Sequence, residues 1–171
     1  RPPVSKLAFR ALGCVYLLLI FGAPAAACVS CLLAFPTPGL RILVAALSPL
    51  LYGFVYAGTA GILSLPHQRY IREGKLPRDL ADWRYFHRRL YGLCWTSVYY
   101  MTPLLLVATS VPWAQNALLR LFGYRGSSKL TTYPDTWIRD LPLLRFADGV
   151  YLSNKATIGT NIVLANGKIL I

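Results

Sequence analysis

The sequence predicts a membrane-embedded α-helical hairpin, with two to three apolar helices, followed by the start of a left-handed parallel β-helix. Two uncharged segments, residues 11–35 and 42–65, predict the helices, because each exceeds the roughly 20 apolar residues needed to span a hydrocarbon core. A six-residue repeat that begins at residue 146 predicts the β-helix. Of the 171 residues, 56% are hydrophobic, more than soluble domains usually carry. We therefore divide the chain into membrane-embedded helices at 1–117 and a linker with the first β-helix coils at 118–171.

A short turn separates the two long apolar segments, since Pro36-Thr37-Pro38-Gly39 lies between them. Pro49 falls inside the second segment, where a membrane helix tolerates it as a kink. Small residues recur at every fourth position, a spacing that lets two helix backbones approach each other: Gly22, Ala26 and Ser30 in the first segment, and Gly53, Ala57 and Gly61 in the second. We expect the two helices to pack as an antiparallel hairpin. Neither contains Asp, Glu, Lys, Arg or His to mark an ion pathway, so transport is not expected.

Basic residues predict the orientation of this hairpin. The net charge is +12, from 18 Lys and Arg against 6 Asp and Glu, and the loop at 66–92 holds seven of the basic residues. Because basic loops stay in the cytoplasm, we expect the N-terminus and this loop on the cytoplasmic side of a multi-pass protein of the cell membrane. A basic protein can bind nucleic acid, but here the basic residues accompany long uncharged segments. We therefore interpret them as signals of membrane topology and expect no nucleic acid as a partner.

The basic loop also predicts a helix that lies on the membrane surface. Pro77 is a suitable first residue for such a helix. Its apolar face would contain Leu80, Trp83, Phe86, His87 and Leu90, between arginines. An amphipathic helix of this composition is expected to lie on anionic lipid.

Residues 93–111 form a third apolar segment, just long enough to cross, with Pro103 inside it. A full crossing would place everything from Pro112 onward outside the cell, including seven basic residues, against the charge rule. A helix broken at Pro103 that re-enters the cytoplasmic face removes this conflict, and we favour it. The number of crossings, two or three, stays open.

Candidate catalytic and ligand residues are few. His67 and His87 both lie in the basic loop with no nucleophile pattern nearby, so we interpret them as interfacial polar residues rather than catalytic ones. Cys28 and Cys31 have C-x-x-C spacing, but inside a membrane helix we interpret them as packing residues. The sequence contains no Gly-rich phosphate loop and no His/Cys/carboxylate cluster. Catalytic residues are therefore unknown, and no metal ligand or cofactor-binding residue is expected in this segment.

The repeat itself consists of Phe146, Leu152, Ile158, Leu164 and Leu170, at intervals of six, each followed by a small residue or, at the last position, by Ile171. Turn formers come next, and the leading residue of each unit is expected to point into the prism of a β-helix. One or two β-hairpins with fortuitous spacing are the alternative. At three hexads per coil the repeat makes roughly one and a half turns, and a solenoid needs about three stacked units. We therefore expect the chain to be a piece of a longer polypeptide.

Before the repeat, residues 118–123 form a short amphipathic run that ends on Gly123, and residues 129–140 are polar and aromatic. An apolar hairpin joined through Leu119-Arg120-Leu121-Phe122-Gly123 to hexapeptide repeats resembles the C-terminal region of nonribosomal peptide synthetases of the Pls/PosA (poly-lysine synthetase) type. The specific text is Trp-Ile-Arg-Asp-Leu-Pro-Leu-Leu-Arg-Phe-Ala-Asp-Gly-Val-Tyr-Leu at 137–152, followed by Ser-Asn-Lys-Ala-Thr-Ile-Gly-Thr-Asn at 153–161. It looks like the entry to a hexapeptide acyltransferase coil. Two features depart from that pattern: residues 125–130 lack the usual Gly-Ala-x-Ile-Gly start, and the coil contains no histidine to act as a base.

This resemblance implies that the parent protein forms amide bonds when an amine attacks a carrier-bound aminoacyl thioester. Phosphopantetheine and ATP are implied as cofactors of that parent and not of this segment. The segment would be part of an acyl-transfer or peptide ligase enzyme without a complete active site, with the lipid bilayer and the carrier-bound substrate as partners and oligomerisation left open. Two alternatives stay open: an integral-membrane sugar or lipid O-acyltransferase, and a non-catalytic membrane scaffold.

Overall fold

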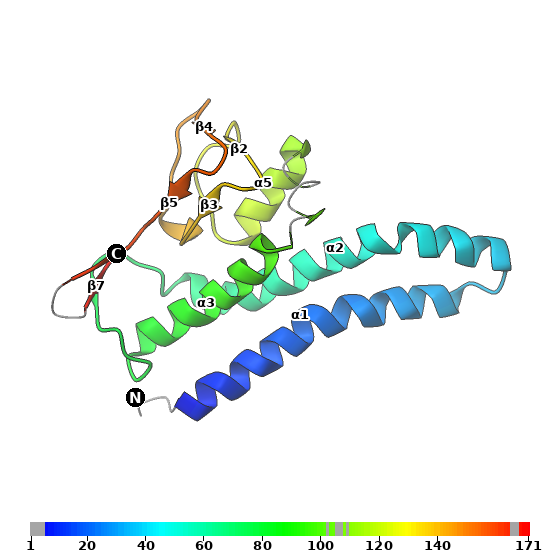
Figure 1. The fold of residues 1–171 in the computed structure, drawn as a ribbon, viewed down its shortest axis with the longest axis horizontal. Coiled ribbons are helices and arrows are strands. Elements are labelled where there is room, and N and C mark those ends of the chain that lie inside the picture. Colours follow the sequence, from blue (N-terminus) through cyan, green and yellow to red (C-terminus); the bar gives the residue numbers. More distant parts are fainter. Residues whose placement is uncertain (1–5, 102, 105–107, 109, 165–167) are drawn as a thin grey trace.

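Two long antiparallel helices run along the length of the molecule (Figure 1). The computed structural model describes residues 6–101, 103, 104, 108, 110–164 and 168–171. Helix α1 spans Lys6–Ala34 and α2 spans Pro38–Gln68, with Pro38 at the first helical position. At 1.5 Å per residue the two helices are each roughly 45 Å long, more than the roughly 30 Å of a hydrocarbon core. Both apolar segments are thus confirmed as continuous helices, each long and apolar enough to cross a membrane.

The hairpin packs through large side chains and not through the predicted small residues of the first helix. Ile20 is fully buried, and the Tyr52 hydroxyl donates to the Phe21 carbonyl oxygen at 3.4 Å. The residues predicted for the interface, Gly22, Ala26 and Ser30, are all exposed instead. In α2, Gly61 faces helix α5 (Pro112–Leu121), where an added Cβ would lie 2.2 Å from Cγ of Leu121. The small-residue prediction was therefore wrong for α1, because the helix turns that stripe away from α2.

Helix α3 (Trp83–Tyr99) begins later than predicted. Pro77, the expected first residue, instead follows strand β1 (Lys75–Leu76) and lies outside any helix. The helix starts at Trp83 because the Asp82 carboxylate accepts a hydrogen bond from the Tyr85 backbone N–H at 3.0 Å.

The apolar face of α3 lies inside the protein and not on a lipid surface. Phe86, His87 and Leu90 are buried, and Phe86 packs edge-on against Phe9 of α1, with ring centroids 5.8 Å apart. The prediction of an interfacial helix was wrong, because the C-terminal half of α2 offers this face a protein surface to pack against.

The third apolar segment is not one helix in the described residues. Helix α3 ends at Tyr99, ahead of Pro103, and α5 (Pro112–Leu121) begins beyond the segment. Over the described part of the chain, α1 and α2 are the two helices that are long and apolar enough to span a membrane. The rest of the expected third crossing falls partly on residues 102, 105–107 and 109, outside the described residues. At its end, α5 stops as predicted, with Gly123 at a φ of +90°.

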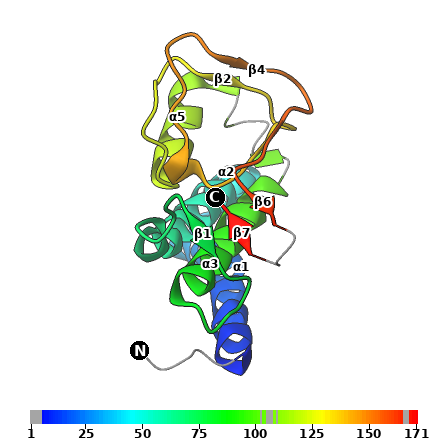
Figure 2. The ribbon, with the colours of Figure 1, turned by 90° about the vertical axis from the view of Figure 1, so that its left-hand side faces the viewer.

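Four two-residue strands follow α5 and pair in parallel: β2 (Thr131–Thr132) with β4 (Tyr151–Leu152), and β3 (Trp137–Ile138) with β5 (Thr157–Ile158). Between them a 3-10 turn, η1, spans Leu141–Leu143. Thr131 lies opposite Tyr151 and Trp137 lies opposite Thr157, an offset of 20 residues in both pairs. Figure 2 shows this part of the chain winding above α2 and α3. The strands are too short to form a clear β-helix by themselves.

The last units of the repeat leave the predicted pattern. Strands β6 (Ile162–Val163) and β7 (Ile169–Leu170) pair antiparallel, and β7 also pairs with β1 in the order β1-β7-β6. This register buries Ile169 with Leu76 and Tyr85 and leaves Leu170 at the surface. The expectation that Leu170 continues an inward row was wrong, because β1 supplies a hydrogen-bonding edge that sets a different register.

One hydrophobic core joins the helices to the strand segment, which we define as β2 to β5 with the turns between them, residues 131–158. It includes Tyr56 of α2, Trp95 of α3, Phe122 after α5 and Leu141 of η1. The half of the hairpin toward its tip lies beyond this core (Figure 1), and many of its large apolar side chains are exposed, including Leu33, Ile42 and Leu47. An uncovered apolar surface of this length is consistent with insertion in a membrane.

Candidate functional site

The two histidines meet inside the protein. His67 at the end of α2 and His87 in α3 have their Nδ1 atoms 2.6 Å apart, and the two residues are 3% and 7% exposed. The Tyr16 hydroxyl of α1 lies 2.9 Å from Nε2 of His67. The interpretation of both histidines as interfacial residues was wrong, because α2 and α3 cross where these rings lie.

A hydrogen bond between two ring nitrogens needs one donor and one acceptor, so the two Nδ1 atoms share a single proton. Aromatic rings surround the pair: Tyr70 stacks on His87 with centroids 3.9 Å apart, and Trp83 meets the same ring edge-on at 4.4 Å. This arrangement links α1, α2 and α3. The geometry supports a packing and proton-sharing role for the pair.

A buried ion pair connects α3 to the strand segment. Nη2 of Arg88 lies 2.5 Å from Oδ2 of Asp140, and the side chains are 4% and 2% exposed. The same carboxylate accepts a hydrogen bond from the Thr160 hydroxyl. Asp140 adopts a left-handed backbone conformation with φ of 51° directly before η1, which turns its side chain toward α3.

Side chains of α3 donate further hydrogen bonds to this segment and to Phe122, the residue that follows α5. Nε1 of Trp95 donates to the Ile138 carbonyl oxygen at 2.6 Å, and the Tyr91 hydroxyl donates to that of Phe122 at 2.9 Å. The Tyr99 hydroxyl donates to the Asp135 carbonyl oxygen at 3.3 Å. Together with the ion pair, these bonds make α3 the platform on which the strands are held.

Sequence reasoning did not identify Arg88 or Asp140 as partners. They lie 52 residues apart, and no local spacing relates them. One signal was present: Asp140 is one of only six acidic residues, and the apolar run Leu-Pro-Leu-Leu follows it directly. Such a carboxylate needs a cation when it is buried.

The cysteines do not form a reactive or metal-binding group in the described residues. Cys28 and Cys31 are half-buried in α1, and the Cys28 thiol donates to the Ser48 carbonyl oxygen at 3.5 Å. Burial raises the pKa of the Cys94 thiol in α3 to about 12, so it stays protonated at neutral pH. In the part of the chain that the structure describes, no three His, Cys, Asp or Glu side chains gather to hold a metal ion.

No protein-family model, no curated protein and no solved structure matches this chain. Its function is therefore argued from the geometry above and from the pattern of its residues.

Proposed function

We propose that this chain anchors an acyl-transfer enzyme of the nonribosomal peptide synthetase type in the membrane and carries the first coils of its left-handed β-helix. The observation that carries the proposal is the equal offset of 20 residues in the two parallel strand pairs. A constant offset between successive parallel strands is the property of a chain that winds in coils, each stacked on the previous one.

The spacing within each coil agrees with a hexapeptide repeat. Thr132 and Ile138 lie six residues apart in the first coil, as do Leu152 and Ile158 in the second, and the first three of these are buried. A hydrogen bond between the two coils supports a third side of the β-helix: the Ser127 backbone N–H donates to the Phe146 carbonyl oxygen at 3.0 Å. The η1 turn lengthens this coil beyond the roughly 18 residues of three hexads. The left-handed sense of the winding is what the resemblance to hexapeptide acyltransferases implies.

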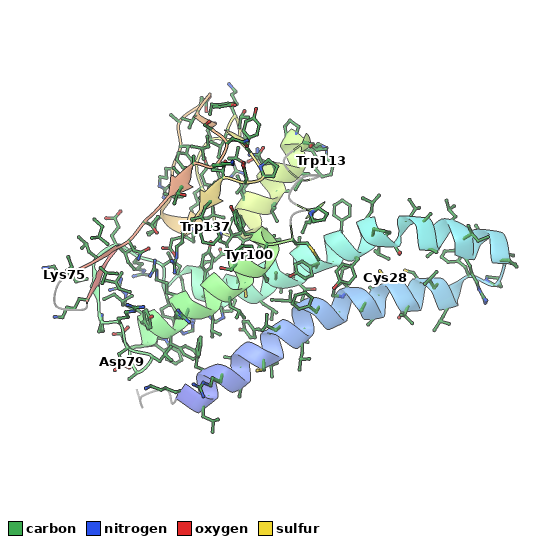
Figure 3. The ribbon with its side chains drawn as sticks, viewed as in Figure 1. Cys28, Lys75, Asp79, Tyr100, Trp113 and Trp137 are labelled. Atoms are coloured by element: carbon green, nitrogen blue, oxygen red, sulfur yellow. The ribbon has the colours of Figure 1, made fainter. Side chains whose placement is uncertain are left out.

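The arrangement of the helices supports a role as anchor. The strand segment lies beside the open end of the hairpin, away from its exposed tip (Figure 1). Lys75 and Asp79 of the basic loop lie at this same end (Figure 3). A hairpin inserted from its tip would hold the strands and the basic loop together on one side of the membrane, the cytoplasmic side by the charge rule.

In the proposed parent, an amine attacks the carbonyl carbon of a carrier-bound thioester. The new C–N bond replaces the C–S bond, the amine loses a proton, and the carrier thiol leaves. Phosphopantetheine would carry the thioester and ATP would activate the amino acid, both outside this segment. Within the segment, Arg88 and Asp140 position the coil on α3, and no described residue is assigned to the reaction.

The test is the mass and modification of the native gene product. An antibody against residues 66–92 should detect, in detergent extracts, a protein several times larger than the 19.0 kDa of this chain. Intact mass spectrometry of that protein should release a phosphopantetheine fragment. A large product without phosphopantetheine would support a membrane O-acyltransferase instead, and a product near 19.0 kDa would leave only a membrane scaffold.

A further inference from the structure

A groove of about 530 Å³ lies between α1 and α3. This volume falls within the roughly 300–1,000 Å³ of sites that hold small molecules. The lining changes character along the groove: three arginines stand at one end, and apolar or uncharged side chains form the remainder.

The arginine end holds three guanidinium groups beside one carboxylate, that of Asp140, so two positive charges are in excess. Arg88 is paired with Asp140, whereas Arg89 is exposed above the Phe9 ring, with its guanidinium carbon 5.9 Å from the ring centroid. Arg139 is half-buried. Burial is the main cause that lowers its pKa; the Asp140 carboxylate acts in the opposite direction, and the Arg88 and Arg89 cations lower the pKa further. No Asp or Glu is among the described residues that line the groove. A bound anion would therefore relieve the repulsion between these guanidinium groups.

The opposite part of the groove is suited to an apolar chain. Leu17 and Phe21 of α1 form one wall, and Leu93 and Met101 stand on the other side. Leu17 and Phe21 are also exposed, so the groove opens beside α1, on a surface that the proposed insertion places against lipid. From Arg89 to Tyr100 the groove follows α3 for roughly 16 Å.

The polarity of the groove matches the polarity of a membrane leaflet. Its cationic end lies near the open end of the hairpin, where Phe9 and Arg89 meet. Its apolar end extends toward Tyr100, which lies further toward the hairpin tip than Lys75 and Asp79 do (Figure 3). We propose that the groove binds one anionic membrane lipid, with its phosphate on Arg89 and Arg139 and one acyl chain along the wall of Leu17 and Phe21. This inference rests on the membrane insertion that forms part of the proposed function.

Lipid retention measured by native mass spectrometry tests the proposal. The protein is reconstituted in nanodiscs of phosphatidylcholine with and without phosphatidylglycerol and is then transferred to detergent. The unmodified chain should retain one phosphatidylglycerol in preference to phosphatidylcholine. Double substitution Arg89→Gln and Arg139→Gln should weaken this retention about thirtyfold, because each cation near an anionic lipid contributes about 1 kcal/mol and about 1.4 kcal/mol corresponds to a tenfold change in affinity.

A matched control removes the same charge elsewhere: Arg78→Gln with Arg125→Gln changes two exposed arginines outside the groove and should leave retention unchanged. Thr96→Trp fills the apolar part with all three arginines present, and it should also release the lipid. Equal retention by the two double variants, or no preference for phosphatidylglycerol, would overturn the proposal. Resistance of the protein to carbonate extraction is measured in parallel, since failure to insert would contradict the anchor, whereas insertion without lipid retention contradicts the groove alone.

Discussion

At the scale of single residues, the ion pair between Arg88 and Asp140 carries the attachment of the strands to the helices. Both side chains are almost fully buried, and a buried charge is costly once its partner is removed. Sequence reasoning could not find this pair, because nothing in a linear pattern relates positions 88 and 140. It could not find the contact of His67 with His87 either, since that contact depends on where α2 and α3 cross.

We predict that Asp140→Asn lowers the free energy of unfolding by about 3–5 kcal/mol, because it leaves the Arg88 guanidinium buried without a counter-charge. Asparagine tolerates the left-handed backbone at this position, so the change tests the charge and not the turn. Thermal unfolding in detergent, measured for Asp140→Asn, Arg88→Met and the double variant, gives the coupling between the two residues. Lys129→Met, at the exposed pair with Asp148, should cause no measurable change. Additive effects of the two buried substitutions would contradict the coupling.

At the scale of elements, the long helices were predictable and their packing was not. Hydropathy alone identified α1 and α2, since their side chains are apolar over more than a membrane thickness. The start of α3 was missed because Asp82, and not Pro77, supplies the cap. The stripe of small residues predicted a hairpin of α1 and α2, and the hairpin is present, but the small residues of α1 do not form its interface. Gly61 makes room for Leu121 of α5 and not for α1.

The close approach of Gly61 to Leu121 predicts that Gly61→Ala destabilises the contact between α2 and α5. The added methyl group would lie within 2.2 Å of Leu121, and overpacking of this kind costs about 1–3 kcal/mol. Gly58→Ala is the matched control in the same helix, where an added Cβ meets nothing within 4 Å. It should be neutral or stabilise the helix by up to about 1 kcal/mol. Unfolding in detergent measures both variants, and equal stabilities would contradict the packing.

At the scale of the whole molecule, an exposed apolar hairpin projects from a core that joins three helices to a winding strand segment. The six-residue spacing agrees with β4 and β5, which contain Leu152 and Ile158, and fails after them; it did not predict β2 and β3, which lie before Phe146. The failure has a physical cause, because β1 lies far away in sequence and offers its edge to β7, which no repeat could indicate. The central claim that follows is that the segment winds as a parallel coil and not as a pair of hairpins.

Disulfide formation between Thr131→Cys and Tyr151→Cys tests this claim most directly, in a chain whose four native cysteines are replaced by alanine. The two positions are exposed and lie opposite each other on adjacent parallel strands, which are about 4.8 Å apart and within the reach of a disulfide. A hairpin of β4 and β5 would instead place residue 151 opposite residue 158, so the tested chain also carries Ile158→Cys. Mass spectrometry after mild oxidation should find the 131–151 crosslink and little of the 151–158 crosslink; the reverse result would contradict the coil.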